Sequence, residues 1–89
     1  MERREIVYSG RVQGVGFRAT ARRVAAGFAV SGWVRNEEDG TVRLEVQGAT
    51  RDVDAFVVEV RTQLRDFIKG ETARYGLSVI DESGFEIAR

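Results

Sequence analysis

The stretch from Gly10 to Arg18 reads Gly-Arg-Val-Gln-Gly-Val-Gly-Phe-Arg. It holds three glycines within seven residues and lies between a run of alternating apolar residues and an amphipathic helical pattern. Glycine contributes no side-chain packing and loses the most backbone entropy on folding, so this cluster indicates an unusual backbone path or the close approach of a ligand. The stretch therefore predicts a strand, a loop and a helix in succession.

The loop has the features of an anion site. Backbone N–H groups point outward at the start of a helix and attract negative charge. Arg18 falls in or just before the first helical turn, where the helix dipole disfavours a cation by about 0.3–1 kcal/mol. An arginine in this position is explained if an anion occupies the same place. We therefore expect a small pocket for a phosphate or carboxylate group, made of backbone amides and Arg18.

The stretch is flanked by two elements with clear periodicity. Residues 5–12 alternate between apolar and mixed positions, which predicts a strand. Residues 18–29 carry apolar residues at the spacing i, i+3, i+4, i+7, which predicts a helix with a thin, alanine-rich face. The residues of that face are Ala21, Val24, Ala25 and Phe28.

A β-hairpin is expected next. Residues 31–36 predict a short second strand, and residues 41–47 predict a third strand with a regular alternation. Asp39 and Gly40 form a turn signal between them. The apolar face of the third strand consists of Val42, Leu44 and Val46.

The second half of the chain predicts one helix and two strands. Thr50 is expected to cap the helix at its N-terminus. The helical period is carried by Val53, Phe56, Val57, Val60 and Leu64. Residues 66–73 give no clear pattern, and Gly70 is expected in a loop. Residues 74–80 predict a fourth strand, and residues 84–88 predict a short final strand after a turn.

The element order is therefore β-α-β-β-α-β with a short extra strand. The simplest architecture for residues 1–89 is one domain with the ferredoxin-like α+β sandwich fold, in which two helices cover one face of an antiparallel sheet. The first and third strands are central neighbours in that fold. Asn36, at the end of the second strand, can then face the glycine loop. Because many functions share this fold, the fold alone does not indicate one.

Composition narrows the classes of partner and of chemistry. The 89 residues carry 14 basic and 14 acidic side chains, so the net charge is zero. This balance argues against a partner held by bulk electrostatics, such as a nucleic acid or an anionic membrane. The absence of cysteine and histidine leaves no thiol chemistry and removes the commonest general base and metal ligand. With no signal peptide or membrane span recognised, we expect a cytoplasmic protein, and we expect a monomer.

Residues 10–18 and residues 32–42 closely resemble the two signatures of acylphosphatases. The second stretch reads Gly-Trp-Val-Arg-Asn-Glu-Glu-Asp-Gly-Thr-Val. The resemblance covers both motifs at family-like spacing and the whole order of elements. It implies a ferredoxin-like fold and the hydrolysis of a carboxylic–phosphoric anhydride, an acyl phosphate, to a carboxylate and inorganic phosphate without a metal or cofactor.

The same resemblance implies roles for individual residues. Arg18 is expected to bind the substrate, and Asn36 is expected to orient the attacking water, so these two are the candidate catalytic residues. The loop is expected to cradle the phosphate through the backbone amides of Gln13, Gly14, Val15, Gly16 and Phe17. The chain departs from the family pattern in its last third, where a Gly-Pro pair is common and this sequence contains no proline.

The residue types at the candidate site limit its chemistry independently of the resemblance. Asn36 is a neutral amide that donates and accepts hydrogen bonds but is not a useful general base. The site can therefore bind charge and position water, which is sufficient for phosphoryl transfer when the leaving group is good. A carboxylate has a conjugate-acid pKa of about 4 and leaves without protonation, whereas an alkoxide needs an acid. The residues thus favour acyl phosphates over alkyl phosphates, with the proton of the water passing to a phosphate oxygen of the substrate.

Other interpretations of the same residues remain. Taken singly, the glycines could form a tight turn, Arg18 could be a solvated helix residue, and Asn36 could cap the hairpin. Trp33 is interpreted as a packing residue, and Thr41 as an ordinary strand residue that could also support Asn36.

Three other functional classes share part of this sequence pattern. A dinucleotide-binding fold would need a longer chain. An RNA-binding module would need aromatic side chains on its central strands, and residues 41–47 contain none. A non-catalytic small-anion-binding or regulatory domain is the alternative that the sequence leaves open.

Overall fold

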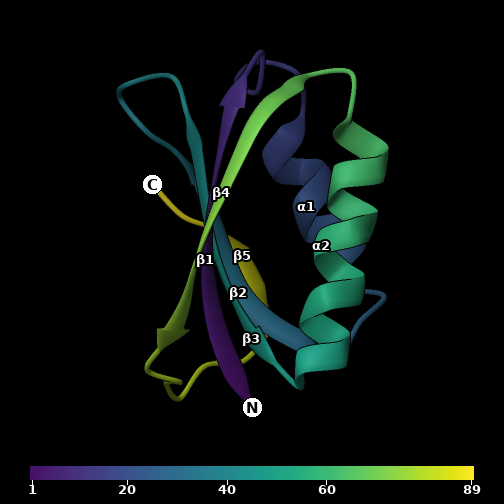
Figure 1. The fold of residues 1–89 in the computed structure, drawn as a ribbon, viewed down its shortest axis with the longest axis vertical. Helices are drawn as coiled ribbons and strands as arrows, with labels where there is room; N and C mark the ends of the chain where they lie inside the picture. Colours follow the sequence, from purple (N-terminus) through teal and green to yellow (C-terminus); the bar gives the residue numbers. More distant parts are fainter.

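The computed structural model describes all 89 residues as a five-stranded sheet with two helices on one of its faces (Figure 1). The elements are β1 (Glu2–Gly10), α1 (Phe17–Ala25), β2 (Val30–Asn36), β3 (Val42–Gly48), α2 (Thr50–Leu64), β4 (Ile68–Leu77) and β5 (Phe85–Ile87). The strand order is β4-β1-β3-β2-β5, and only β2 and β5 are parallel neighbours. The predicted ferredoxin-like fold is confirmed. Neither helix has the length and apolar character that crossing a membrane requires.

The core lies between the sheet and the helices, because alternate residues of the strands face the same side. The helix-facing positions of the sheet that are fully buried are Ile6, Tyr8, Val34, Val42, Leu44 and Val46. The helices contribute their predicted apolar stripes, and the buried residues of these stripes are Ala21, Val24, Ala25, Val53, Phe56, Val57, Val60 and Leu64. The predicted hydrophobic periodicity therefore identifies most of the core.

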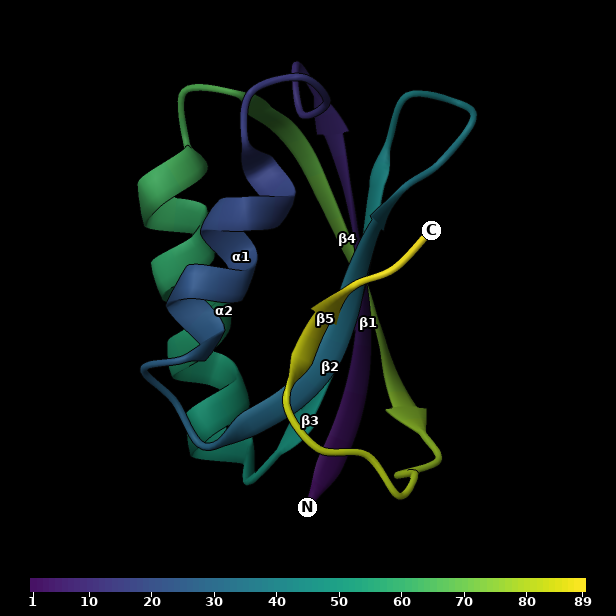
Figure 2. The same ribbon diagram turned by 180° about the vertical axis from the view of Figure 1, so that it is seen from behind.

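The strand register brings the glycine loop and Asn36 to the same end of the sheet. In the antiparallel ladders, Val42 pairs with Tyr8 on one side and with Asn36 on the other. β1 ends two residues after Tyr8, at Gly10, so the loop that follows it emerges beside the end of β2. Figures 1 and 2 show this loop and the β2–β3 hairpin at the same end of the molecule. The prediction that β1 and β3 are neighbours in the sheet is thus confirmed.

Two predicted boundaries in the first half of the chain differ from the structure. β1 ends at Gly10 rather than at residue 12, because Val12 leaves the sheet and is buried in the core. The first helix ends at Ala25 rather than at residue 29. Phe28 keeps its predicted apolar contact from the turn that follows, where its ring meets the ring of Phe56 edge-on at 6.5 Å.

The larger errors lie in the second half. Residues 66–73 are not a poorly defined loop, since β4 begins at Ile68 and ends at Leu77 rather than spanning residues 74–80. Gly70 lies inside this strand opposite Ser9, where a Cβ atom would stand 2.5 Å from the Ser9 hydroxyl oxygen. The glycine therefore permits close packing of two strands and does not mark a loop.

The cap of the second helix also differs from the prediction. Ala49 occupies the N-cap position without a side-chain hydrogen bond, and Thr50 is the first helical residue. The last strand, β5, is shorter than predicted, running from Phe85 to Ile87.

The segment before β5 crosses the sheet face that the helices leave open. The side chain of Gln47 accepts a hydrogen bond from the Ile80 amide at 3.0 Å and donates one to the Ile80 carbonyl at 2.8 Å. The guanidinium of Arg3 donates to a carboxylate oxygen of Glu82 at 3.0 Å. These contacts hold the segment against the sheet. The chain then reaches the edge formed by β5, which lies along β2 with Ile87 paired with Val34 (Figure 2).

Candidate active site

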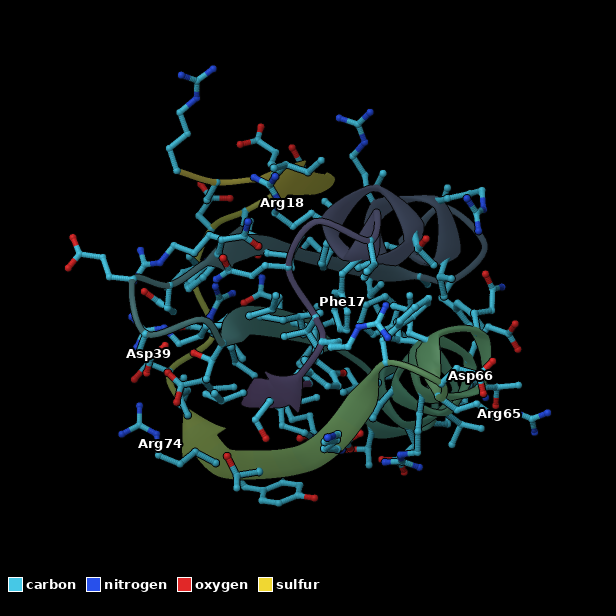
Figure 3. All side chains as sticks on the ribbon, turned by 90° about the horizontal axis from the view of Figure 1, so that it is seen from above. Phe17, Arg18, Asp39, Arg65, Asp66 and Arg74 are labelled. Carbon is cyan, nitrogen blue, oxygen red and sulfur yellow. The ribbon has the colours of Figure 1, made fainter.

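A cavity of about 260 Å³ opens at the end of the sheet, between the glycine loop, the start of α1 and the ends of β2 and β5. It is lined by Val12, Gly14, Gly16, Phe17, Arg18, Ala19, Asn36 and Ile87. Figure 3 looks down on this end of the molecule. Phe17 lies in the middle, among the side chains between helices and sheet, whereas Arg18 lies toward β5. The two candidate catalytic residues, Arg18 and Asn36, therefore line one cavity.

The loop presents a run of unpaired backbone donors. The Arg11 amide donates to the Phe67 carbonyl at 2.9 Å, and the Thr20 amide donates to the Gly16 carbonyl at 3.0 Å. None of the amides from Val12 to Ala19 has an acceptor within the protein. A helix start alone leaves four such donors, and Gly16 at the N-cap has no side chain to satisfy them. The loop and the helix start thus form a longer row of donors suited to an anion.

Two of the loop glycines adopt a backbone conformation that favours glycine. Gly14 has φ +76° and Gly16 has φ +79°, in the left-handed region that other residues adopt at a cost. A Cβ atom at either position would meet no atom within 4 Å. The loop therefore requires glycine for its path, and the space beside both residues stays open.

Phe17 anchors the junction between the loop and α1. Its side chain is only 2% exposed, and its ring lies 4.8 Å from the ring of Tyr8 between their centroids. The side chain of Phe17 thus belongs to the core, and only its backbone can contribute to the cradle that the sequence predicted. Val15 is half-buried against the core and does not line the cavity.

Arg18 is an exposed cation without a counterion in the protein. The arginines that pair with carboxylates are Arg3, Arg4, Arg35, Arg43, Arg61 and Arg74. Arg18 makes no such pair, and the first turn of α1 contains no acidic residue. The positive charge of the guanidinium and the positive end of the helix dipole therefore act together at the cavity.

Asn36 reaches the cavity from the last position of β2. Its carbonyl oxygen, Oδ1, is buried and accepts no hydrogen bond from the protein. Leaving a buried acceptor unpaired costs about 1–3 kcal/mol. A half-turn of the amide about χ2 exchanges its acceptor and its donor, so either can face the cavity. This side chain has hydrogen-bonding capacity that the fold does not use.

Asn36 does not cap the hairpin, which is closed by other groups. The Glu37 amide donates to the Thr41 carbonyl at 2.9 Å, and the Gly40 amide donates to the Glu37 carbonyl at 3.2 Å. Asp39 accepts hydrogen bonds from the amide and the hydroxyl of Thr41, at 3.0 and 2.6 Å. These bonds hold the pKa of Asp39 below its usual value, and they show that the Thr41 hydroxyl supports the turn rather than Asn36.

Gln13 has a role that the sequence did not reveal. Its side-chain nitrogen, Nε2, donates to the carbonyls of Glu37 at 2.8 Å and of Thr41 at 2.9 Å. The side chain is thus turned to the hairpin and does not line the cavity. Of the residues predicted for the phosphate cradle, the cavity lining includes Gly14, Gly16 and Phe17.

The cavity is also lined by two residues that the sequence patterns did not identify. Ala19 follows Arg18 on α1, and Ile87 comes from β5. Ile87 reaches the cavity only because β5 pairs in parallel with β2, and a three-residue strand gives no sequence signal of its partner. The residues that line the cavity include no acid and no histidine, and no group of three possible metal-ligating side chains occurs in the structure.

Comparisons with known proteins agree with one another. A protein-family model described as Acylphosphatase matches residues 4–87. A protein named Acylphosphatase from Bifidobacterium longum is 41% identical over 81 residues, which cover 91% of this chain and 84% of that protein. One from Oceanobacillus iheyensis is 55% identical over 51 residues, 57% of this chain and 56% of that protein. The crystal structure of acylphosphatase from Bacillus subtilis matches the whole of both chains with a TM-score of 0.89 at 28% identity.

Proposed function

The chain belongs to the acylphosphatase family, and from this premise we propose that it hydrolyses acyl phosphates with Arg18 and the loop amides holding the phosphate and Asn36 orienting the water. One observation supports the assignment of roles most directly. The row of unpaired amides and the unpaired cation of Arg18 line the same cavity as an amide side chain with an unused buried acceptor. An anion and a water molecule are the partners that these groups lack.

In the proposed reaction, the phosphate group lies against the amides between Gly14 and Ala19, and the guanidinium of Arg18 balances its charge. Asn36 holds a water molecule beside the phosphorus atom. The water oxygen forms a bond to phosphorus as the bond from phosphorus to the acyl oxygen breaks. The carboxylate leaves with the bonding electrons, and the proton of the water passes to a phosphate oxygen. Catalysis then consists of positioning and electrostatic stabilisation, which is the usual basis of phosphoryl transfer.

The lining of the cavity supports a restriction to good leaving groups. None of the side chains that line it can donate a proton to an alkoxide, because they include no carboxylic acid and no histidine, and a guanidinium does not give up its proton in proteins. A carboxylate, with a conjugate-acid pKa of about 4, needs no such donor. Acyl phosphates are therefore the substrates, and simple alkyl phosphate monoesters are not.

The experiment measures phosphate release from acetyl phosphate and from an alkyl phosphate monoester, with and without a chelator. We expect turnover of acetyl phosphate alone, unchanged by the chelator. Arg18→Ala should abolish both phosphate binding and turnover, whereas Arg22→Ala, an exposed arginine on the same helix, serves as the matched control. Hydrolysis of both substrates, or loss of activity on chelation, would contradict the mechanism.

The same experiment tests the alternative of a non-catalytic anion-binding domain. That domain would bind inorganic phosphate through the same loop without turning over acetyl phosphate. The monomeric state, the cytoplasmic location and the absence of a nucleic-acid partner stay predictions from the sequence.

A further inference from the structure

The Gln13 side chain connects the phosphate loop to the hairpin that follows Asn36. One nitrogen, Nε2, donates to two carbonyls, those of Glu37 and Thr41, which lie 24 and 28 residues further along the chain. A primary amide has two N–H donors, so both are used here. The two carbonyls belong to the pair of residues that closes the hairpin, because the Glu37 amide also donates to the Thr41 carbonyl. Glu37 directly follows Asn36 in the chain.

We propose that Gln13 is a positioning residue that fixes Asn36, and the water it orients, relative to the phosphate cradle. This inference rests on the proposed function. Gln13 directly precedes Gly14, one of the loop residues with a left-handed backbone, so its side chain holds the loop at the point where the cradle begins. The other end of the link is the residue after Asn36. The two halves of the site are thus joined by two hydrogen bonds.

Without Gln13, the phosphate loop and the hairpin after Asn36 would be connected only through the sheet. β1 and β2 are not neighbours, and their ends are related only through Val42 of β3, which pairs with Tyr8 and with Asn36. Apart from the two bonds of Gln13, the loop and the hairpin have no hydrogen bond to each other. A misplacement of about 1 Å between reacting groups can lower a rate by about 100-fold. Loss of the Gln13 link should therefore affect the chemical step more than phosphate binding.

The two hydrogen bonds of Gln13 contribute little to the stability of the fold, because their acceptors have other donors. If Gln13 is removed, the Thr41 carbonyl still accepts from the Glu37 amide, and the Glu37 carbonyl still accepts from the Gly40 amide. No carbonyl is left without a donor, and the Gln13 side chain is only half-buried. We expect a Gln13 variant to fold and to unfold only slightly earlier on heating. A positioning role and a structural role are thereby separable.

The test compares Gln13→Met, which keeps the length of the side chain but has no donor, with wild type on acetyl phosphate. We expect kcat to fall by about 10- to 100-fold, while the inhibition constant of inorganic phosphate changes less than about twofold. Gln63→Met is the matched control, because Gln63 is an exposed glutamine whose hydrogen bonds are to Arg23 and Glu59 on the helices. Thermal unfolding of each variant checks that it is folded.

A second variant, Gln13→Glu, gives a readout that a structural role would not move. Its carboxylate faces two carbonyl oxygens without a donor, whereas the protonated acid has one O–H to donate. Relative to wild type, its kcat should therefore recover as the pH falls and the carboxyl group becomes protonated. A kcat ratio that stays constant with pH would overturn the proposal.

The double variant Gln13→Met with Asn36→Ala separates this proposal from the proposed function. Because Gln13 acts through Asn36, the double variant should be no slower than Asn36→Ala alone. Multiplicative losses in the double variant, an unchanged kcat in Gln13→Met, or equal changes in kcat and in phosphate binding would each overturn the positioning role. Full activity of Asn36→Ala would instead contradict the proposed function itself.

Discussion

Replacing Asn36 by alanine should strongly lower turnover without destabilising the fold. The buried Oδ1 atom has no donor, and an unpaired buried acceptor costs about 1–3 kcal/mol. Alanine removes that cost and gives up only the packing of a short, half-exposed side chain. We expect the free energy of unfolding to stay constant or to rise by up to about 2 kcal/mol. Each kcal/mol corresponds to about 4–8 °C in Tm for a domain of this size. Turnover of acetyl phosphate should fall by about 100- to 1000-fold, the loss typical of one well-placed hydrogen-bonding group.

Gln47 provides the contrasting case of a buried amide that the fold does use. It is 2% exposed, and its side chain bonds to the Arg3 guanidinium at 2.8 Å and to both backbone groups of Ile80. Gln47→Ala would leave the amide and carbonyl of Ile80 without a partner inside the protein and would remove one of the hydrogen bonds of Arg3. We expect a loss of about 2–4 kcal/mol in the free energy of unfolding, with little effect on kcat, since Gln47 lies on the opposite face of the sheet from the cavity.

The assay is urea unfolding of both variants and wild type, with the m-value checked for constancy, beside kcat on acetyl phosphate. A stable but inactive Asn36→Ala and a weakened but active Gln47→Ala would match the reasoning. If Asn36→Ala is destabilised as much as Gln47→Ala, the amide of Asn36 serves the fold, and its role in orienting water is refuted.

Four further outcomes follow from the cavity and the sheet. Arg18→Lys keeps the charge but loses the planar fork of donors, so the inhibition constant of phosphate should rise by about 10-fold, whereas Arg18→Ala should abolish phosphate binding; phosphate competition measures both. Gly16→Ala should cost about 1–2 kcal/mol of stability, because φ is +79° but no atom obstructs the Cβ. Gly32→Ala should cost more than Gly16→Ala in the same unfolding experiment, since its Cβ would overlap the carbonyl of Glu45. Ile87→Ser should raise KM for benzoyl phosphate about fivefold relative to acetyl phosphate, because it removes apolar surface from the lining of the cavity; equal changes in both KM values would exclude a contact between Ile87 and the acyl group.

Much of the molecule could be predicted from the sequence. The acylphosphatase family, the class of enzyme and the ferredoxin-like fold are confirmed. The hydrophobic alternation of β3 and the helical stripes placed most of the core, because burial on one face imposes a period on the sequence. The adjacency of Asn36 and the glycine loop followed from the strand order alone.

Two of the errors, at Gly70 and Thr50, have a common physical origin, since each concerns a residue type with more than one structural use. The sequence predicts a loop at Gly70, but Gly70 packs against Ser9 within paired strands. Thr50 has the chemistry of a helix cap, yet the chain turns one residue earlier, at Ala49. A glycine that permits close approach and a glycine that permits a turn look alike in a sequence. Only the position of the neighbouring strand distinguishes them.

The candidate site shows the same distinction in what was found and what was missed. Gly14 and Gly16 were found because a left-handed backbone leaves a mark on the sequence, namely a residue without a Cβ. The contacts of Gln13 were missed because its partners are backbone carbonyls, which every residue possesses, so nothing at positions 37 and 41 identifies them. For a site built from main-chain donors, the sequence therefore indicates the backbone conformation of the loop. It does not indicate the hydrogen bonds that hold the loop in place. The two proposed catalytic side chains, Arg18 and Asn36, follow from the resemblance of residues 10–18 and 32–42 to the acylphosphatase signatures, whereas the Gln13 link is evident only in the folded structure.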